Sequence, residues 1–176
     1  MDHFMEEVVV KHNRAMDDVL YVLCNIIMVV SALFALLLIQ PLLANFSAYA
    51  LVVVLCSAGI AVLLFFYRDR LRTEYEYTFT NGDLDFAQVF NNQKRKTLGT
   101  MRVKNVEAFG TVDSNEFRKL INMPGLTRKN WFLNRASKLY YFYYQKESNR
   151  TILVLEPSEE LVTMIRKYLP NNAWRG

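Results

Sequence analysis

The most constraining feature of this sequence is a stretch of 49 residues, 19–67, that contains no charged side chain. Crossing the hydrocarbon of a bilayer takes roughly 20 apolar residues in a helix. The stretch is too long for one such span, and its length suits two spans with a short connection. Turn-forming and polar residues at 40–47 supply that connection, which predicts membrane helices at 19–39 and 48–67. A buried helix pair in a soluble protein would carry a polar stripe, and neither segment has one.

The positions of Lys and Arg predict how this hairpin is oriented. The connection at 40–47 has neither residue. Basic residues flank both spans instead: Lys11 and Arg14 precede the first, and Arg68, Arg70 and Arg72 follow the second. We therefore expect a two-span protein of the cell membrane with both termini in the cytoplasm. Cleavage of a signal peptide near residues 48–50 is the alternative, but the apolar run before that point is much longer than a signal peptide needs.

Small and polar residues inside the hairpin allow several contacts. Ser57 and Ala61 belong to a small face suited to close helix packing, either within the hairpin or between copies of the chain as a homo-oligomer. Asn25 can bond to the neighbouring helix or be satisfied locally. Cys24 and Cys56 are interpreted as small apolar residues. The spans contain no acidic, basic or histidine side chain, so transport of ions or protons is not predicted.

Residues 1–18 form an N-terminal amphipathic segment with a net charge of 2 − 5 = −3. Five of its residues recur at helical spacing: Met5, Val8, Val9, His12 and Met16. The spacing predicts a short helix that lies at the membrane interface or continues into the first span. His3 and His12 are the only histidines, and nine positions separate them, so a metal site is not predicted.

Residues 73–170 are predicted to form a small β domain. Thr73–Thr80 alternates aromatic and polar side chains, and Asn81-Gly82 follows, which is a strong hairpin signal. Further strands are expected at 83–90, 94–103, 106–112, 137–146 and 151–155, with a loop at 125–136. The chain ends in a helix over 157–170 with one apolar face. The predicted fold class is a membrane α-helical hairpin plus an α+β soluble domain, a small antiparallel β-barrel capped by the C-terminal helix.

This order of strands and a final helix resembles a pleckstrin-homology-like domain. More specifically, residues 74–77 (Glu-Tyr-Glu-Tyr), 80–85 (Thr-Asn-Gly-Asp-Leu-Asp) and 94–96 (Lys-Arg-Lys) resemble a family of small two-span membrane proteins of anaerobic Gram-positive bacteria. That family is a domain of unknown function, and the resemblance extends over nearly the whole chain. It implies the architecture and carries no activity with it.

Catalytic signatures are missing from the sequence. Residues 68–176 contain no Cys or His, and the chain has no phosphate-binding loop, nucleophile elbow or dinucleotide-binding glycine motif. We therefore expect no enzyme activity, no cofactor and no metal. Nucleic-acid binding is not expected either, because it would need a larger basic surface interleaved with aromatic residues.

Binding to lipid or protein is the remaining chemistry, and basic residues with two aromatics are its candidates. They are Arg68, Arg70, Arg72, Lys94, Arg95, Lys96, Arg128, Lys129, Trp131 and Phe132. The first three would meet anionic headgroups or simply fix the topology, and the Lys94–Lys96 cluster is either a site or a solvated basic edge. Trp131 and Phe132 would dip into the inner leaflet, dock on a partner or fold back over the barrel.

From these features we expect a membrane-anchored, non-catalytic adaptor or scaffold that presents a cytosolic domain for binding an unidentified protein or a lipid. The alternative is a subunit of a larger membrane complex in which the helical hairpin is the functional part.

Overall fold

The computed structural model describes residues 3–146 and 149–175. It divides into two compact units, which are taken in turn below. The hairpin unit comprises residues 13–73 and 90–93, and the β domain comprises the described residues of 1–12, 74–89 and 94–176. The turn predicted at 147–149 falls mostly outside the described residues.

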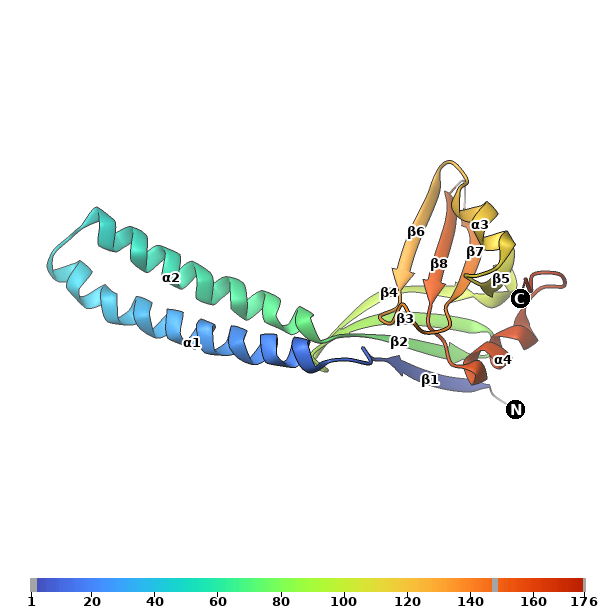
Figure 1. Ribbon diagram of the computed structural model, residues 1–176, viewed down its shortest axis with the longest axis horizontal. Coiled ribbons are helices and arrows are strands. Elements are labelled where there is room, and N and C mark those ends of the chain that lie inside the picture. Colours follow the sequence, from blue (N-terminus) through green and yellow to red (C-terminus); the bar gives the residue numbers. More distant parts are fainter. Residues whose placement is uncertain (1–2, 147–148, 176) are drawn as a thin grey trace. The chain divides into compact units, whose positions relative to one another are not determined.

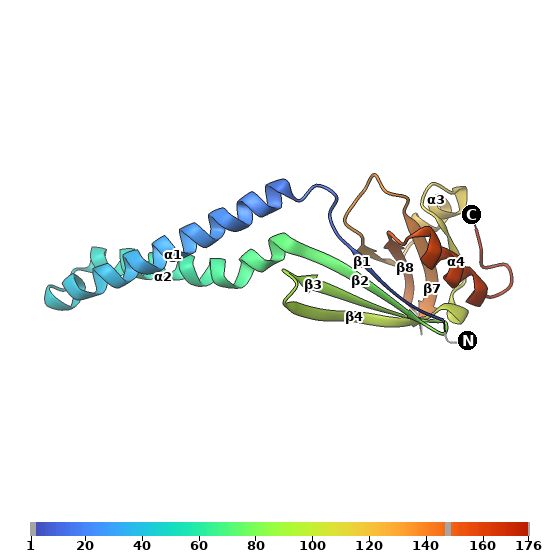
Figure 2. The same ribbon diagram turned by 90° about the horizontal axis from the view of Figure 1, so that it is seen from below.

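The hairpin unit contains two antiparallel helices, α1 (Ala15–Ala44) and α2 (Ala48–Tyr67), which lie side by side (Figures 1 and 2). Both are long and apolar enough to cross a membrane, as the sequence predicts. α1 continues through Pro41, where a turn was expected, and the connection is confined to residues 45–47. Pro41 has no N–H to donate to the carbonyl of Leu37, so α1 lacks that bond. The helix nevertheless continues to Ala44, and Asn45 N donates to the Pro41 carbonyl at 3.0 Å. The short 3-10 helix η1 (Arg68–Arg72) follows α2.

The N-terminal segment is a strand, β1 (Phe4–Val9), so the predicted helix is wrong. β1 pairs antiparallel with β2 (Thr73–Thr80), in register from Phe4 opposite Thr80 to Val9 opposite Tyr75. A short isolated helix is marginal in water, whereas an added strand gains both ladder bonds and burial of Val9. In the sequence, the two apolar helices therefore lie between two strands that are neighbours in one sheet.

The first sheet has the order β1-β2-β3-β4, with β3 at Asp83–Phe90 and β4 at Lys94–Arg102. Tyr77 and Phe79 of β2 are fully buried, which confirms the predicted alternation. The β2–β3 turn requires its glycine, since Gly82 has φ +96° and a Cβ there would lie 2.6 Å from the Tyr168 ring. On β3, Leu84, Phe86 and Val89 are buried. Strict alternation from Leu84 and Phe86 would bury residue 88 and not Val89, so the inward face shifts by one residue along that strand.

The second sheet has the order β5-β7-β8-β6. Its strands are β5 (Ala108–Thr111), β6 (Leu126–Trp131), β7 (Tyr140–Lys146) and β8 (Asn149–Leu155). β6 lies where a loop was predicted, and it runs parallel to β8, so the sheet is mixed rather than wholly antiparallel. The helix α3 (Asn115–Ile121), capped by the Ser114 hydroxyl, covers the outer face through Phe117 and Leu120.

The two sheets do not join into the closed barrel that was predicted. Within the described residues they remain separate four-stranded sheets, whose strands cross one another in Figure 1. The 3-10 turn η2 (Val103–Asn105) interrupts the chain between β4 and β5, and β5 then begins the second sheet instead of extending the first. A closed barrel has no edge strand, whereas β1, β4, β5 and β6 each lie at an edge in the described residues.

The main core lies between the sheets and is completed by the C-terminal helix α4 (Glu159–Tyr168). Leu161, Val162 and Ile165 of α4 are buried, as the sequence predicts. The Ser158 hydroxyl caps the helix by accepting from Leu161 N at 3.2 Å. Glu7 of β1 also accepts from Ser158 N, at 2.9 and 3.0 Å, and thereby ties the first strand to the last helix.

Candidate functional site

Four strands of the β domain carry basic side chains and no acidic one. β4, β6, β7 and β8 together contain eight cations: Lys94, Arg95, Lys96, Arg102, Arg128, Lys129, Lys146 and Arg150. β4 and β6 are edge strands of their two sheets. The edges of β4 and β6 face the same side of the domain, which we call the open side of the sandwich.

A groove lies on this open side, between the edge of β4 and the inner face of the second sheet. Its central hollow has a volume of about 250 Å³ and an apolar floor that includes Phe86, Trp131 and Leu153. Hollows of about 240 and 350 Å³ adjoin it, and all three share Tyr144 and Lys146 as lining residues. We call the three hollows together the β4–β6 groove.

Two lysines belong to the β4–β6 groove, and both lie on the inner face of the second sheet. Lys129 alternates with Trp131 along β6, and Lys146 continues the alternation of Tyr140, Phe142 and Tyr144 along β7. Lys129 Nζ lies 5.4 Å from the centroid of the Trp131 ring. Within the described part of the chain, neither ammonium is paired with a carboxylate. Lys129 is partly buried and Lys146 is exposed, so both ammonium groups can meet an anionic group that enters the groove.

The predicted Lys94–Lys96 cluster divides between different surroundings. Arg95 lies on the outer face of the sheet, where it bonds to Glu76 and lies 3.8 Å from Glu6. The hydrogen bond to Glu76 raises the pKa of Arg95. Lys94 and Lys96 are exposed at the start of β4. The cluster is therefore a partly neutralised basic edge, and Arg95 is already engaged.

Trp131 and Phe132 fold back into the β domain. Trp131 packs on the main core, with its ring centroid 4.9 Å from that of Phe86, and Phe132 packs on the second core under α3. Of the alternatives stated for this segment, insertion into a leaflet is the one that these contacts oppose. Arg128 donates to the Ile121 carbonyl, and Lys129 is the residue of this segment that reaches the groove.

The three arginines after the second helix also have different environments. Arg72 pairs with Asp18 at 2.8 Å and stacks on the Tyr21 ring at 4.1 Å. Arg68 donates to Asn25 Oδ1, while Asn25 Nδ2 donates to the Tyr21 carbonyl at 2.7 Å, so this amide is satisfied both locally and across the hairpin. Arg70 is exposed and lies 4.6 Å from the Tyr67 ring centroid. Arg68 and Arg72 thus hold the base of the hairpin together.

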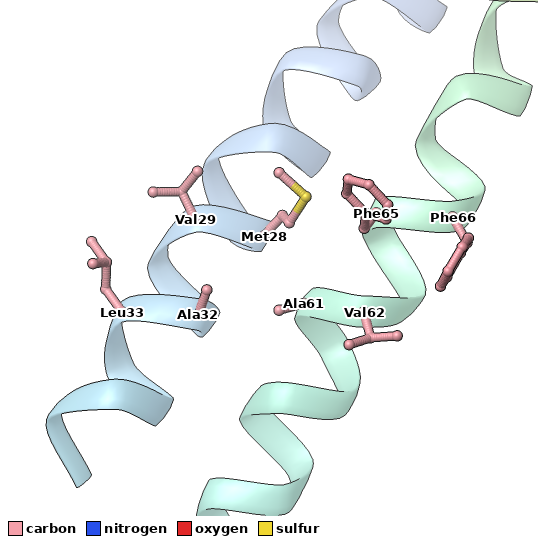
Figure 3. Close-up of a pocket in the computed structure, with 8 residues that line it drawn as sticks. All are labelled: Met28, Val29, Ala32, Leu33, Ala61, Val62, Phe65 and Phe66. Atoms are coloured by element: carbon pink, nitrogen blue, oxygen red, sulfur yellow. The ribbon is translucent and has the colours of Figure 1, made fainter. Parts of the chain in front are cut away.

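An entirely apolar groove of about 550 Å³ runs between α1 and α2 (Figure 3). Ala32 and Ala61 lie at its centre, where their small side chains leave the space open, and Phe65 and Phe66 lie at one end. Ser57 is buried, and its hydroxyl donates to the Val53 carbonyl at 2.9 Å, so the small face contributes to packing within the hairpin.

The most buried carboxylate of the β domain has a structural role. Glu156 is 9% exposed and accepts from Asn134 N at 2.9 Å and from Asn134 Nδ2 at 2.8 Å. Asn134 also donates to the Val10 carbonyl and accepts from His12 N, which fixes the chain just after β1. Across the described residues, no three His, Cys, Asp or Glu side chains gather in a way that could hold a metal ion.

Sequence reasoning identified Lys129 but missed Lys146 and Tyr144. Their signal was present in the strict alternation of β7, which places both on the face of Phe142. Its significance depends on β4, whose edge reaches this face only in the folded domain.

Comparison with protein-family models matches residues 1–175 to the family described as "Bacterial PH-like domain (DUF6106)". A search of the curated proteins found no match. A search of the solved structures found none either.

Proposed function

Since the chain belongs to the bacterial PH-like domain family, we propose that it is a membrane-anchored, non-catalytic adaptor. The helical hairpin anchors the chain in the cell membrane as two spans, and the β domain binds a partner at the cytoplasmic surface. The β4–β6 groove is the binding site in this proposal, because it combines an apolar floor with cations that have no acidic partner in the described residues.

The observation that carries the proposal is the pairing of β1 with β2. Because these neighbouring strands precede and follow the hairpin, both of its ends connect to the same sheet. The two links, residues 10–14 and η1, have five residues each and can span at most about 17 Å. A domain tied to two spans by links this short stays next to the headgroups, which suits a module that recruits a partner to a membrane.

The orientation in this proposal rests on charge. The connection at 45–47 and the preceding residues 40–44 contain no Lys or Arg, whereas basic residues flank the outer ends of both helices. Both termini and the β domain are therefore assigned to the cytoplasm.

The second candidate function, a subunit of a membrane complex, is favoured by the apolar groove between α1 and α2. The same hairpin would then form the interface with other membrane helices, or with a second copy of the chain.

A chimera separates the two functions. Residues 15–67 are replaced by an unrelated two-span hairpin of equal length, and partners are identified by crosslinking and mass spectrometry in native membranes. An adaptor keeps its partners in the chimera and loses them when Lys129 and Lys146 are both changed to Gln. Partners that disappear in the chimera but persist in the double variant would instead assign the function to the hairpin.

A further inference from the structure

We propose that the β4–β6 groove binds an extended acidic segment of a partner protein, which adds to the free edge of β4 as a fifth strand of the first sheet. The inference rests on the proposed adaptor function, and it names the kind of partner and how it is held.

The lining of the groove shows that β4 presents its edge. Leu98, Gly99, Thr100 and Met101 are consecutive, and all four border the central hollow. Residues that line a cavity with the face of a strand alternate, as Lys129 and Trp131 do on β6. β4 is also the last strand of its sheet in the described structure, so its outer row of backbone N–H and C=O groups has no ladder partner there. Such an edge is the template on which an extended peptide adds.

Gly99 lies in the middle of this edge, next to open space. Its φ is +150°, and a Cβ built there meets no atom within 4 Å. Glycine inside a strand often marks a place where another backbone approaches closely. The Thr100 hydroxyl is engaged with Asp85 on β3, so it points away from the free edge.

Charge selects the sequence of the added strand. A peptide paired with β4 would place alternate side chains over the floor of the groove, near Phe86 and Leu153. Its acidic side chains would meet Lys129 and Lys146, which have no carboxylate partner in the described residues. A second copy of β4 is a poor occupant, because like charges on paired strands repel. Because the apolar floor and both lysines line the same hollow, the fitting ligand carries its apolar and acidic residues together on one face, at every second position, with neutral polar residues between them.

An anionic lipid headgroup could also bind two lysines, but it would leave the edge of β4 unused. The experiment therefore tests the edge and the charges separately. The probe is a fluorescein-labelled ten-residue peptide with glutamate and leucine in turn at the odd positions and threonine at the even positions, so that one face carries both. It is titrated against the full chain in phosphatidylcholine nanodiscs and followed by fluorescence anisotropy. A peptide of the same sequence, N-methylated at alternate residues, keeps the charges and removes the donors that pair with β4.

We expect the probe to bind. The N-methylated peptide should lose at least about tenfold in affinity, because it cannot make the neutral backbone hydrogen bonds that pair the probe with β4. The double variant Lys129→Gln/Lys146→Gln should also lose at least about tenfold, since two charge-assisted contacts disappear. The matched control is Lys104→Gln/Lys119→Gln, which removes two exposed cations from η2 and α3 and should bind as the native chain does. An unchanged midpoint of urea unfolding in both variants verifies folding.

Three results would overturn the proposal: no binding of the probe to the folded chain, equal binding of the N-methylated peptide, or equal losses in the test and control variants. Binding of a soluble short-chain phosphatidylglycerol that needs Lys129 and Lys146, without peptide binding, would assign the groove to lipid. The adaptor function has its own test. If the hairpin chimera keeps its partners but the peptide does not bind, the strand-addition proposal is refuted and the adaptor function is not.

Discussion

Replacing Asn134 by alanine is expected to destabilise the β domain strongly, although Asn134 lies in a connection and not in a strand or helix. The side chain is 8% exposed and makes three hydrogen bonds. Nδ2 donates to the Val10 carbonyl at 2.9 Å and to Glu156 Oε1 at 2.8 Å, and Oδ1 accepts from His12 N at 2.8 Å. Two of these bonds hold the residues that link β1 to the first helix.

The magnitude follows from the kinds of bond lost. A neutral hydrogen bond contributes about 1 kcal/mol, and one to a charged group contributes about 1.5–3 kcal/mol. The two backbone bonds and the bond to the Glu156 carboxylate therefore amount to about 3–5 kcal/mol, against a total stability of about 5–15 kcal/mol for a typical domain.

Tryptophan fluorescence measures this loss selectively. Trp131 and Trp174 are the only tryptophans in the sequence, and both belong to the β domain. Urea unfolding of the full chain in detergent, followed by this signal, thus reports on the β domain, and hydrogen exchange at Phe4–Val9 reports whether β1 is released. Asn130→Ala is the matched control, because Asn130 is exposed on β6. If Asn134→Ala costs no more than Asn130→Ala and β1 stays protected, the reasoning is wrong.

Three further predictions concern packing, orientation and ionisation. Ile165→Ala should lower the unfolding free energy by about 2–5 kcal/mol in the same assay, because Ile165 is fully buried. Lys167→Ala, at an exposed position, should change it by less than about 0.5 kcal/mol, and equal effects of the two changes would mean that α4 is not packed. In a chain with both native cysteines changed to alanine, Ser47→Cys should react with an impermeant maleimide on intact cells and Asn122→Cys should not; the reverse pattern contradicts the orientation. Burial raises the pKa of four phenols, so the folded state holds these protons more tightly, and their contribution to stability is complete below about pH 10 and is lost as the pH rises further. The four phenols belong to Tyr75, Tyr77, Tyr141 and Tyr144. Phenolate absorbance should therefore appear at higher pH in the folded chain than in the urea-unfolded chain. Titration curves that coincide in the two states would refute this.

The elements that the sequence predicts well have local signals. The β2–β3 hairpin follows from strict alternation and from Asn81-Gly82, whose left-handed backbone the structure contains. α4 follows from an apolar face that includes Leu161 and Ile165. In each case the residues that decide the conformation lie within one turn or one strand of each other, so no distant partner is needed.

The missed elements depend on partners far along the chain. The apolar residues of β1 fit helical and strand periods alike, and its inward Glu7 looks like a solvent-facing residue until Ser158 N is beside it. β6 is mostly polar, and its partner β8 follows it in sequence after another strand. The groove was out of reach for the same reason, because the inward position of Lys129 has no meaning before β4 and the second sheet meet.

The pairing of β1 with β2 also sets an order of events during synthesis. Phe4 must wait for Thr80 before it can pair, and at about 5–20 residues per second this takes roughly 4–15 s. In the proposed arrangement, the two spans enter the bilayer during that interval while β1 waits unpaired on the cytoplasmic side. If only one of the two spans were inserted, β1 and β2 would lie on opposite sides of the membrane and could not pair. Pairing of β1 with β2 would thus distinguish a chain with both spans inserted from a chain with one span inserted.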